Sequence, residues 1–281
     1  MKLEYKIIFL SFLTTLICFI QFYTNCCTAN TDIKDYLISS LLFCPEKVLK
    51  ERPLDFGLKY NDIHIPLENG NSLYGWYIPA NKKTKKHIIY FHGSKGNLSL
   101  YLGGIKELHK VGENILIVDY EGFGLSSGNP TIKNTINDGF AIYDFLLNYK
   151  HLKPEDISLF GYSYGGAIAI KVALKRKVYA ILVESTFSSL NEIAVSKYSP
   201  LVSFIVSKHL LNTLSNIKQI DVPVIVAYAE KDQIIPTTHS INIYKNANSP
   251  KYLFKIKNAQ HHNIFKFVSP NYIELIKSVF D

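Results

Sequence analysis

The segment Gly161-Tyr162-Ser163-Tyr164-Gly165 places a serine between two glycines in the pattern G-x-S-x-G. The apolar run ISLFG leads into this motif, and the helix-favouring run GAIAIKVALKRK follows it. A serine at a tight turn between a strand and a helix is exposed for attack on a carbonyl carbon, and the crowded backbone there favours small flanking residues. The spacing therefore predicts that Ser163 is a nucleophile.

A serine hydroxyl is a weak nucleophile at neutral pH and needs an adjacent base, which an acid must orient. Two adjacent histidines, His261 and His262, follow a short predicted strand near the carboxyl end of the chain. Asp232 comes just after the apolar run VPVIVAYA, so that it lies on a loop past the end of a predicted strand. We expect Asp232 to be the acid, with Glu230 and Glu184 as alternatives. On spacing alone, either histidine can be the base.

Acyl transfer also needs two preorganised backbone N–H groups for the oxyanion. Tyr164 follows the nucleophile directly, and Ser94 lies in the loop after the apolar run HIIYF. The sequence therefore predicts the Ser94 and Tyr164 amides as the oxyanion hole. Adjacent histidines rarely bind one ion, and no further ligand cluster joins them, so we expect neither a metal nor an organic cofactor.

Four segments resemble, in order, the α/β-hydrolases related to the membrane-anchored ABHD serine hydrolases and the Bem46-type proteins. They are FHGSKGN (91–97), DYEGFGLSSGNP (119–130), GYSYGG (161–166) and EKDQIIP (230–236). The resemblance extends from about Phe56 to the end of the chain and includes GWYIPA at 75–80. It implies that Ser163 is the nucleophile, Asp232 the acid and Asp119 a structural turn residue.

The chain departs from this family at two positions. Ser94 stands where the family typically has the asparagine of His-Gly-Asn. The final family motif resembles Gly-Ala-Gly-His-Asn, whereas this chain reads Asn-Ala-Gln-His-His-Asn. An ungapped match places the base at His261, and a slip of one residue places it at His262. We expect His261.

The elements that must position these residues alternate along the chain. Near-continuous apolar runs, typical of strands buried on both faces, are separated by stretches with helical spacing. This pattern predicts an α/β-hydrolase fold with a mostly parallel central sheet covered by helices on both faces. The predicted strands are 62–67 and 72–79 as a hairpin, then 87–91, 114–120, 157–161, 179–184, 222–229 and 252–256, and the predicted helices include 132–149, 167–177 and 238–246.

One connection, over 185–220, is longer than the others and contains the apolar run Leu201–Leu211. It is either an ordinary crossover helix packed on the sheet or a small cap insertion that lines an acyl-binding pocket. Both interpretations are compatible with the sequence.

The amino terminus carries Lys2 and Lys6 ahead of an uncharged apolar run, Ile7–Tyr23. The run has the length of a short membrane-spanning helix, and its flanks also suit a secretory signal with cleavage after Ala29. We expect residues 1–29 to be a signal or membrane-anchor segment and 30–281 to be the hydrolase domain, with a buried helix as the alternative for the first segment. The protein is then membrane-anchored through one helix, or secreted or periplasmic if the segment is cleaved.

The 281-residue chain has a formal net charge of +8, and 47% of its residues are hydrophobic, as in a globular protein. Its lysines are spread along the chain, and no nucleic-acid-binding signature is present, so no nucleic-acid partner is expected. All four cysteines lie within the first 44 residues, which does not indicate a disulfide framework.

These features together predict a serine hydrolase that cleaves a carboxylic ester or thioester through a Ser-His-Asp triad and an acyl-enzyme. The apolar run at 201–211 and the amino-terminal segment favour a small-molecule or lipid-like substrate with an apolar acyl group. The alternatives are a serine peptidase of the same fold and a non-catalytic binding protein. The sequence indicates no particular oligomeric state.

Overall fold

The computed structural model describes residues 31–197, 206–207, 210–248 and 250–280. The predicted segment 1–29 lies outside this range, and so does most of the apolar run at 201–211. Among the described residues, no helix combines the length and apolarity needed to cross a bilayer.

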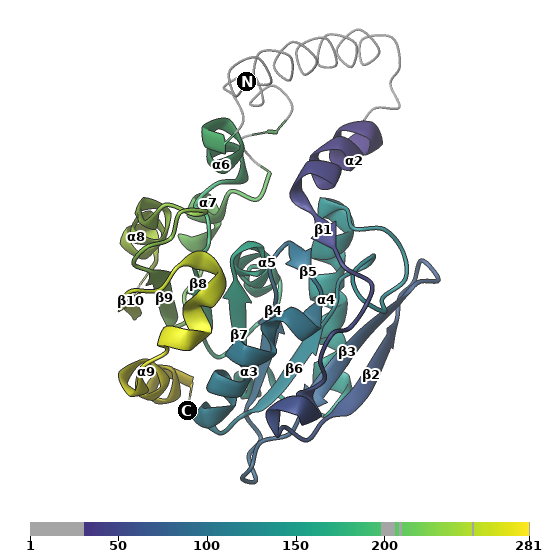
Figure 1. Ribbon diagram of the computed structural model, residues 1–281, viewed down its shortest axis with the longest axis vertical. Helices are drawn as coiled ribbons and strands as arrows, with labels where there is room; N and C mark the ends of the chain where they lie inside the picture. Colours follow the sequence, from purple (N-terminus) through teal and green to yellow (C-terminus); the bar gives the residue numbers. More distant parts are fainter. Residues whose placement is uncertain (1–30, 198–205, 208–209, 249, 281) are drawn as a thin grey trace, which may run out of the picture.

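A single eight-stranded sheet forms the centre of the molecule, in the order β10-β9-β8-β7-β4-β6-β3-β2 (Figure 1). The six strands from β10 to β6 in this order are parallel, and β3 and β2 are added as an antiparallel edge. The sheet is therefore mostly parallel, as predicted. The strands are β2 (Asn61–Pro66), β3 (Ser72–Ile78), β4 (His87–Phe91), β6 (Asn114–Val118), β7 (Ile157–Tyr162), β8 (Ile181–Glu184), β9 (Val224–Ala229) and β10 (Lys251–Ile256).

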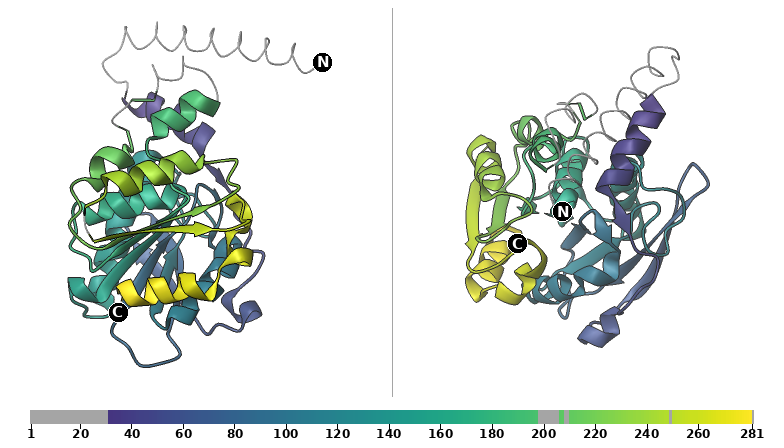
Figure 2. Two further views of the ribbon diagram at one scale, coloured as in Figure 1. Left: turned by 90° about the vertical axis from the view of Figure 1, so that its left-hand side faces the viewer. Right: turned by 45° about the horizontal axis from the view of Figure 1, so that its top comes forward.

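Helices cover both faces of this sheet, which explains the unbroken apolar runs of the central strands (Figure 2). In β4, Ile89 and Phe91 pack into the core beneath α4, α5, α7 and α8, while Ile88 and Tyr90 pack into the core beneath α3 and α9. Every residue of β4 is buried. The helices are α3 (Leu102–Leu108), α4 (Ile132–Tyr149), α5 (Tyr164–Ala173), α7 (Thr213–Ile217), α8 (Thr237–Asn246) and α9 (Pro270–Phe280).

Helix α4 has the bounds that its spacing predicts. It begins after Thr131, whose Oγ1 accepts a hydrogen bond from the Asn134 amide at 3.0 Å. This N-cap satisfies one of the amides that the first turn leaves without an intrahelical partner.

The chain before the sheet reaches back to the loop that follows β4. After α2 (Thr31–Leu42), the two-residue strand β1 (Cys44–Pro45) pairs in parallel with β5 (Lys95–Gly96). The Cys44 amide donates to the Ser94 carbonyl at 3.0 Å. The Asn97 side-chain amide donates to the carbonyls of Glu46 and Val48 at 3.0 and 2.8 Å. Residues 44–48 therefore brace the loop that carries Ser94.

The long connection after β8 begins with α6 (Leu190–Lys197), which lies at the same end of the molecule as α2 (Figures 1 and 2). Leu190, Val206 and Leu211 are among the buried apolar residues of this connection. The middle of the connection lies outside the described residues, and both interpretations of it remain predictions.

Candidate active site

Ser163 lies at the turn between β7 and α5, in a backbone conformation that side chains other than glycine rarely adopt. Its φ and ψ are 54° and −116°, and its amide donates to the Glu184 carbonyl at 2.8 Å. The neighbouring glycines make the turn possible, because a Cβ on Gly165 would lie 2.0 Å from the Phe91 carbonyl oxygen. A strained turn of this kind points the serine hydroxyl outward at the carboxyl end of the sheet.

The structure brings Ser163, His261 and Asp232 together, although 98 positions separate the first two in the sequence. His261 Nε2 lies 3.0 Å from Ser163 Oγ, and His261 Nδ1 lies 2.7 Å from Asp232 Oδ2. Since a carboxylate only accepts, Nδ1 carries the proton and Nε2 is free to accept from the serine hydroxyl. The three side chains follow β7, β9 and β10, whose carboxyl ends lie at one edge of the sheet (Figure 1).

The Asp232 carboxylate is held in its charged form by hydrogen bonds. Burial raises its pKa, but the bond from His261 and those from the Ile235 and Ile234 amides outweigh burial and leave the pKa below its ordinary value. The two amides donate to Oδ1 at 2.8 and 2.9 Å, while Oδ2 faces the imidazole. One oxygen therefore anchors the side chain and the other orients His261.

Sequence reasoning missed a contribution of Tyr162, the residue before the serine. Its hydroxyl donates to the His261 carbonyl at 2.5 Å, and its ring lies 5.3 Å from the imidazole between centroids. Tyr162 therefore fixes the backbone and the ring of His261 from the nucleophile turn. The variable position of G-x-S-x-G carries no signal of this role, because the contact joins residues 99 apart.

The Ser94 and Tyr164 amides, predicted to form the oxyanion hole, lie on two segments whose backbones are closely packed. Tyr164 is the first residue of α5, where N–H groups have no intrahelical acceptor and the helix dipole favours negative charge. Ser94 lies in the loop after β4, and Phe91 of that strand packs against Gly165 of the nucleophile turn. Neither amide donates to another group within the described residues.

The alternative acids and the alternative base contact other partners. Glu184 is buried and accepts a hydrogen bond from the Tyr272 hydroxyl at 2.8 Å, and burial raises its pKa to about 7. Glu230 accepts from the Asn258 amide and pairs with Lys255. His262 packs edge-on against His261, with ring centroids 5.1 Å apart.

The described residues contain no group of three or more His, Cys, Asp or Glu side chains that could hold a metal ion. Cys44 is a free, exposed thiol, and the other three cysteines lie outside the described residues.

Comparison with known proteins agrees with this architecture. The family described as serine aminopeptidase, S33, matches residues 82–213. The uncharacterised protein YfhR of Escherichia coli is 27% identical over 212 residues, which cover 72% of this chain and 74% of that protein. The protein Bem46 of Schizosaccharomyces pombe is 24% identical over 211 residues, covering 72% and 70%.

Solved structures show the same fold. An esterase of Pyrococcus furiosus superposes with a TM-score of 0.68 at 21% identity, covering 84% of this chain and 97% of that one. An α/β-hydrolase of Vibrio vulnificus superposes with a TM-score of 0.66 at 20% identity, covering 78% and 80%. These likenesses confirm the predicted α/β-hydrolase fold, and the family match supports a serine-type hydrolase.

Proposed function

Because the chain is a member of the α/β-hydrolase superfamily that resembles Bem46-type proteins, we propose that it is a serine hydrolase that cleaves a carboxylic ester or thioester. The observation that carries this proposal is the continuous line of contacts from Asp232 through His261 to Ser163 Oγ, at 2.7 and 3.0 Å. The proton positions in this line leave Nε2 as an acceptor for the serine proton, as nucleophilic catalysis requires.

The proposed reaction proceeds in two halves. Ser163 Oγ attacks the substrate carbonyl while His261 Nε2 takes its proton, and the Ser94 and Tyr164 amides stabilise the oxyanion. His261 then gives the proton to the leaving alcohol or thiol, and an acyl-enzyme remains on Ser163. Water, deprotonated by His261, attacks the acyl carbonyl and restores the free serine. Asp232 orients the imidazole and stabilises its positive charge in both halves.

The substrate that we propose is small or lipid-like, with an apolar acyl group. The apolar run at 201–211, next in the chain to α6, supports this assignment. The uncharged run Ile7–Tyr23 supports a protein tethered to a membrane by its amino-terminal segment, where lipid-like acyl compounds are abundant.

A peptidase is the second candidate, because the matching family is described as a serine aminopeptidase. It uses the same triad but prefers amide bonds. Hydrolysis of aminoacyl amides well above that of matched esters and thioesters would favour this candidate.

The test is labelling of the purified full-length chain, in mild detergent, with a fluorophosphonate probe that reacts with activated serines. We expect the wild type to be labelled and Ser163→Ala not to be. Ester turnover in the variant should fall by roughly 10⁴- to 10⁶-fold. Ser278→Ala is the matched control, because the hydroxyl of this exposed serine only donates a hydrogen bond to the Leu275 carbonyl within α9.

A folded wild-type protein that neither reacts with the probe nor hydrolyses any ester, thioester or amide would contradict the proposal. A non-catalytic binding protein would then be the better account of the fold.

A further inference from the structure

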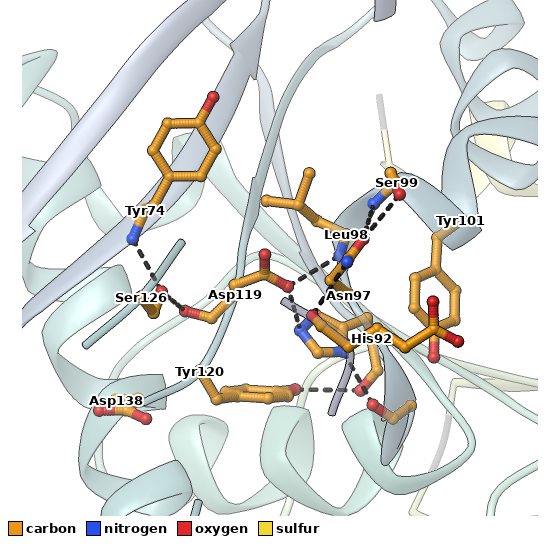
Figure 3. Close-up of polar contacts among 12 residues, drawn as sticks. Tyr74, His92, Asn97, Leu98, Ser99, Tyr101, Asp119, Tyr120, Ser126 and Asp138 are labelled. Atoms are coloured by element: carbon orange, nitrogen blue, oxygen red, sulfur yellow. Dashed lines mark hydrogen bonds and ion pairs between the residues drawn. The ribbon is translucent and has the colours of Figure 1, made fainter. Parts of the chain in front are cut away.

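A fully buried histidine, His92, lies directly beneath the loop that carries Ser94 (Figure 3). It follows the last residue of β4 and is enclosed by aromatic rings. Its ring centroid is 4.4 Å from that of Tyr120 and 5.3 Å from those of Tyr101 and Phe123. The proposed triad does not use this imidazole.

The imidazole is hydrogen-bonded to the peptide group between Gly93 and Ser94, which carries the Ser94 N–H. His92 Nδ1 lies 2.8 Å from the Gly93 carbonyl oxygen, which only accepts, so Nδ1 is the donor. In a planar trans peptide, the Gly93 C=O and the Ser94 N–H point in opposite directions. A bond that fixes the carbonyl toward the buried ring therefore fixes the N–H away from it.

A buried carboxylate faces the other side of this ring and holds the far end of the same loop. Asp119 Oδ1 lies 3.3 Å from His92 Nε2 and accepts a hydrogen bond from the Leu98 amide at 2.7 Å (Figure 3). Between these points, the Tyr101 hydroxyl donates to the Lys95 carbonyl at 2.8 Å. The side chains of His92, Asp119 and Tyr101 therefore hold this loop at Gly93, Leu98 and Lys95.

We propose that His92 is a positioning residue that aims the Ser94 N–H at the oxyanion, and that Asp119 supports it by holding the far end of the same loop. The inference rests on the proposed hydrolase function. It gives Asp119, which the family resemblance implies to be a structural turn residue, a part in the oxyanion hole.

This role has a kinetic signature, because the oxyanion exists only in the transition state and the tetrahedral intermediate. Loss of the Nδ1 bond should lower kcat and leave KM unchanged. Affinity for a trifluoromethyl ketone, which forms a tetrahedral adduct on the serine, should fall in parallel with kcat/KM. A merely structural role would lower the melting temperature without this pattern.

The test compares three variants of the full-length chain in p-nitrophenyl ester hydrolysis. In His92→Asn, the amide nitrogen can take the place of Nδ1, whereas in His92→Gln it reaches toward the place of Nε2. His92→Phe fits the aromatic enclosure and retains neither donor. We expect kcat to fall about 10- to 100-fold in the Phe and Gln variants, less than the roughly 10²- to 10³-fold cost of losing a whole oxyanion donor. The Asn variant should stay within about threefold of the wild type.

His87 provides a matched control at the other end of β4. It is also buried, and its Nδ1 also bonds a carbonyl, that of Lys85 at 2.7 Å. His87→Phe should lower stability but leave kcat unchanged. If His92→Phe fails to fold, the polar variants His92→Asn and His92→Gln carry the test, because only the first keeps a donor in the place of Nδ1.

The outcomes separate this inference from the proposed function. A wild-type protein with no hydrolase activity overturns the proposed function. An active wild type whose His92→Phe variant keeps full kcat, or an active Gln variant beside an inactive Asn variant, overturns the positioning role alone.

Discussion

At the scale of single residues, the proposed chemistry depends on which of two adjacent histidines faces the serine. On sequence spacing alone, either His261 or His262 can be the base, and the match to the family motif favours His261. In the structure, His261 contacts both Ser163 and Asp232, whereas His262 packs against the ring of its neighbour. The two residues therefore form a matched pair for mutation.

We expect His261→Gln to lower kcat by roughly 10⁴- to 10⁶-fold, because the serine loses its base. His262→Gln should stay within about threefold of the wild type, as substitutions away from bonded groups usually do. Steady-state ester hydrolysis by the two purified variants is the measurement. Equal losses in both variants would contradict the assignment of His261 as the base.

At the scale of elements, the strands could be predicted closely, and the nucleophile helix less closely. Strand β4 and helix α4 have the predicted bounds, because buried apolar runs and a 3.6-residue period are local signals. The sequence predicts that helix α5 begins at Ala167, because Gly165 and Gly166 are weak helix formers. In the structure, the helix begins at Tyr164. Close packing requires the two glycines, since a Cβ on Gly166 would lie 1.9 Å from Thr186 Oγ1.

The supporting contacts of the site could not be predicted from the sequence. Tyr162 reaches His261, and His92 reaches Asp119, only once the sheet has ordered its strands. Spacing along the chain identifies residues that carry chemistry, but not the buried partners that orient them.

The contact between α9 and β8 leads to a prediction about pH. Burial raises the pKa of Glu184 from 4.5 to about 7, although Tyr272 donates a hydrogen bond to it. Its folded pKa exceeds its unfolded pKa, so the folded state binds the proton more tightly. Stability from this group is complete below about pH 4.5 and is lost as the pH rises through about 7.

Replacement of this carboxyl by an amide should remove that dependence. Between pH 4.5 and pH 8, the free energy of unfolding of the wild type should fall by up to about 3 kcal/mol relative to Glu184→Gln. Urea unfolding of both proteins across this range is the measurement. The difference between them isolates Glu184 from Asp138, whose pKa burial raises to about 8. Parallel curves for the two proteins would contradict the prediction. Exposed Glu274, in α9 two residues after Tyr272, is the control position.

At the scale of the whole molecule, the amino-terminal region has two parts with different proposed roles. Residues 1–29 contain the uncharged apolar run, and residues 44–48 brace the loop that carries Ser94. The proposed tether and the residues that brace the Ser94 loop are thus separated by only a short length of chain.

We expect removal of residues 1–29 to abolish cosedimentation with phospholipid vesicles while ester turnover stays within about threefold of the full chain. Removal of residues 1–50 should abolish turnover, because it also deletes the brace. Sedimentation and ester hydrolysis on the same preparations test both statements. A full-length chain that stays in the supernatant would contradict the tether, and a fully active 51–281 protein would contradict the brace.

The pairing of β1 with β5 also determines how the molecule responds to mechanical force. Beyond helix α2, the first backbone hydrogen bond of the described chain to another segment joins Cys44 to Ser94. In a protein held by its amino terminus, tension that passes α2 therefore reaches the Ser94 loop before it reaches any strand of the central sheet. The proposed tether and the oxyanion loop are connected in series, with α2 between them, and α2 is anchored to α4 by the bond from the Ile132 amide to Ser39 Oγ at 3.2 Å.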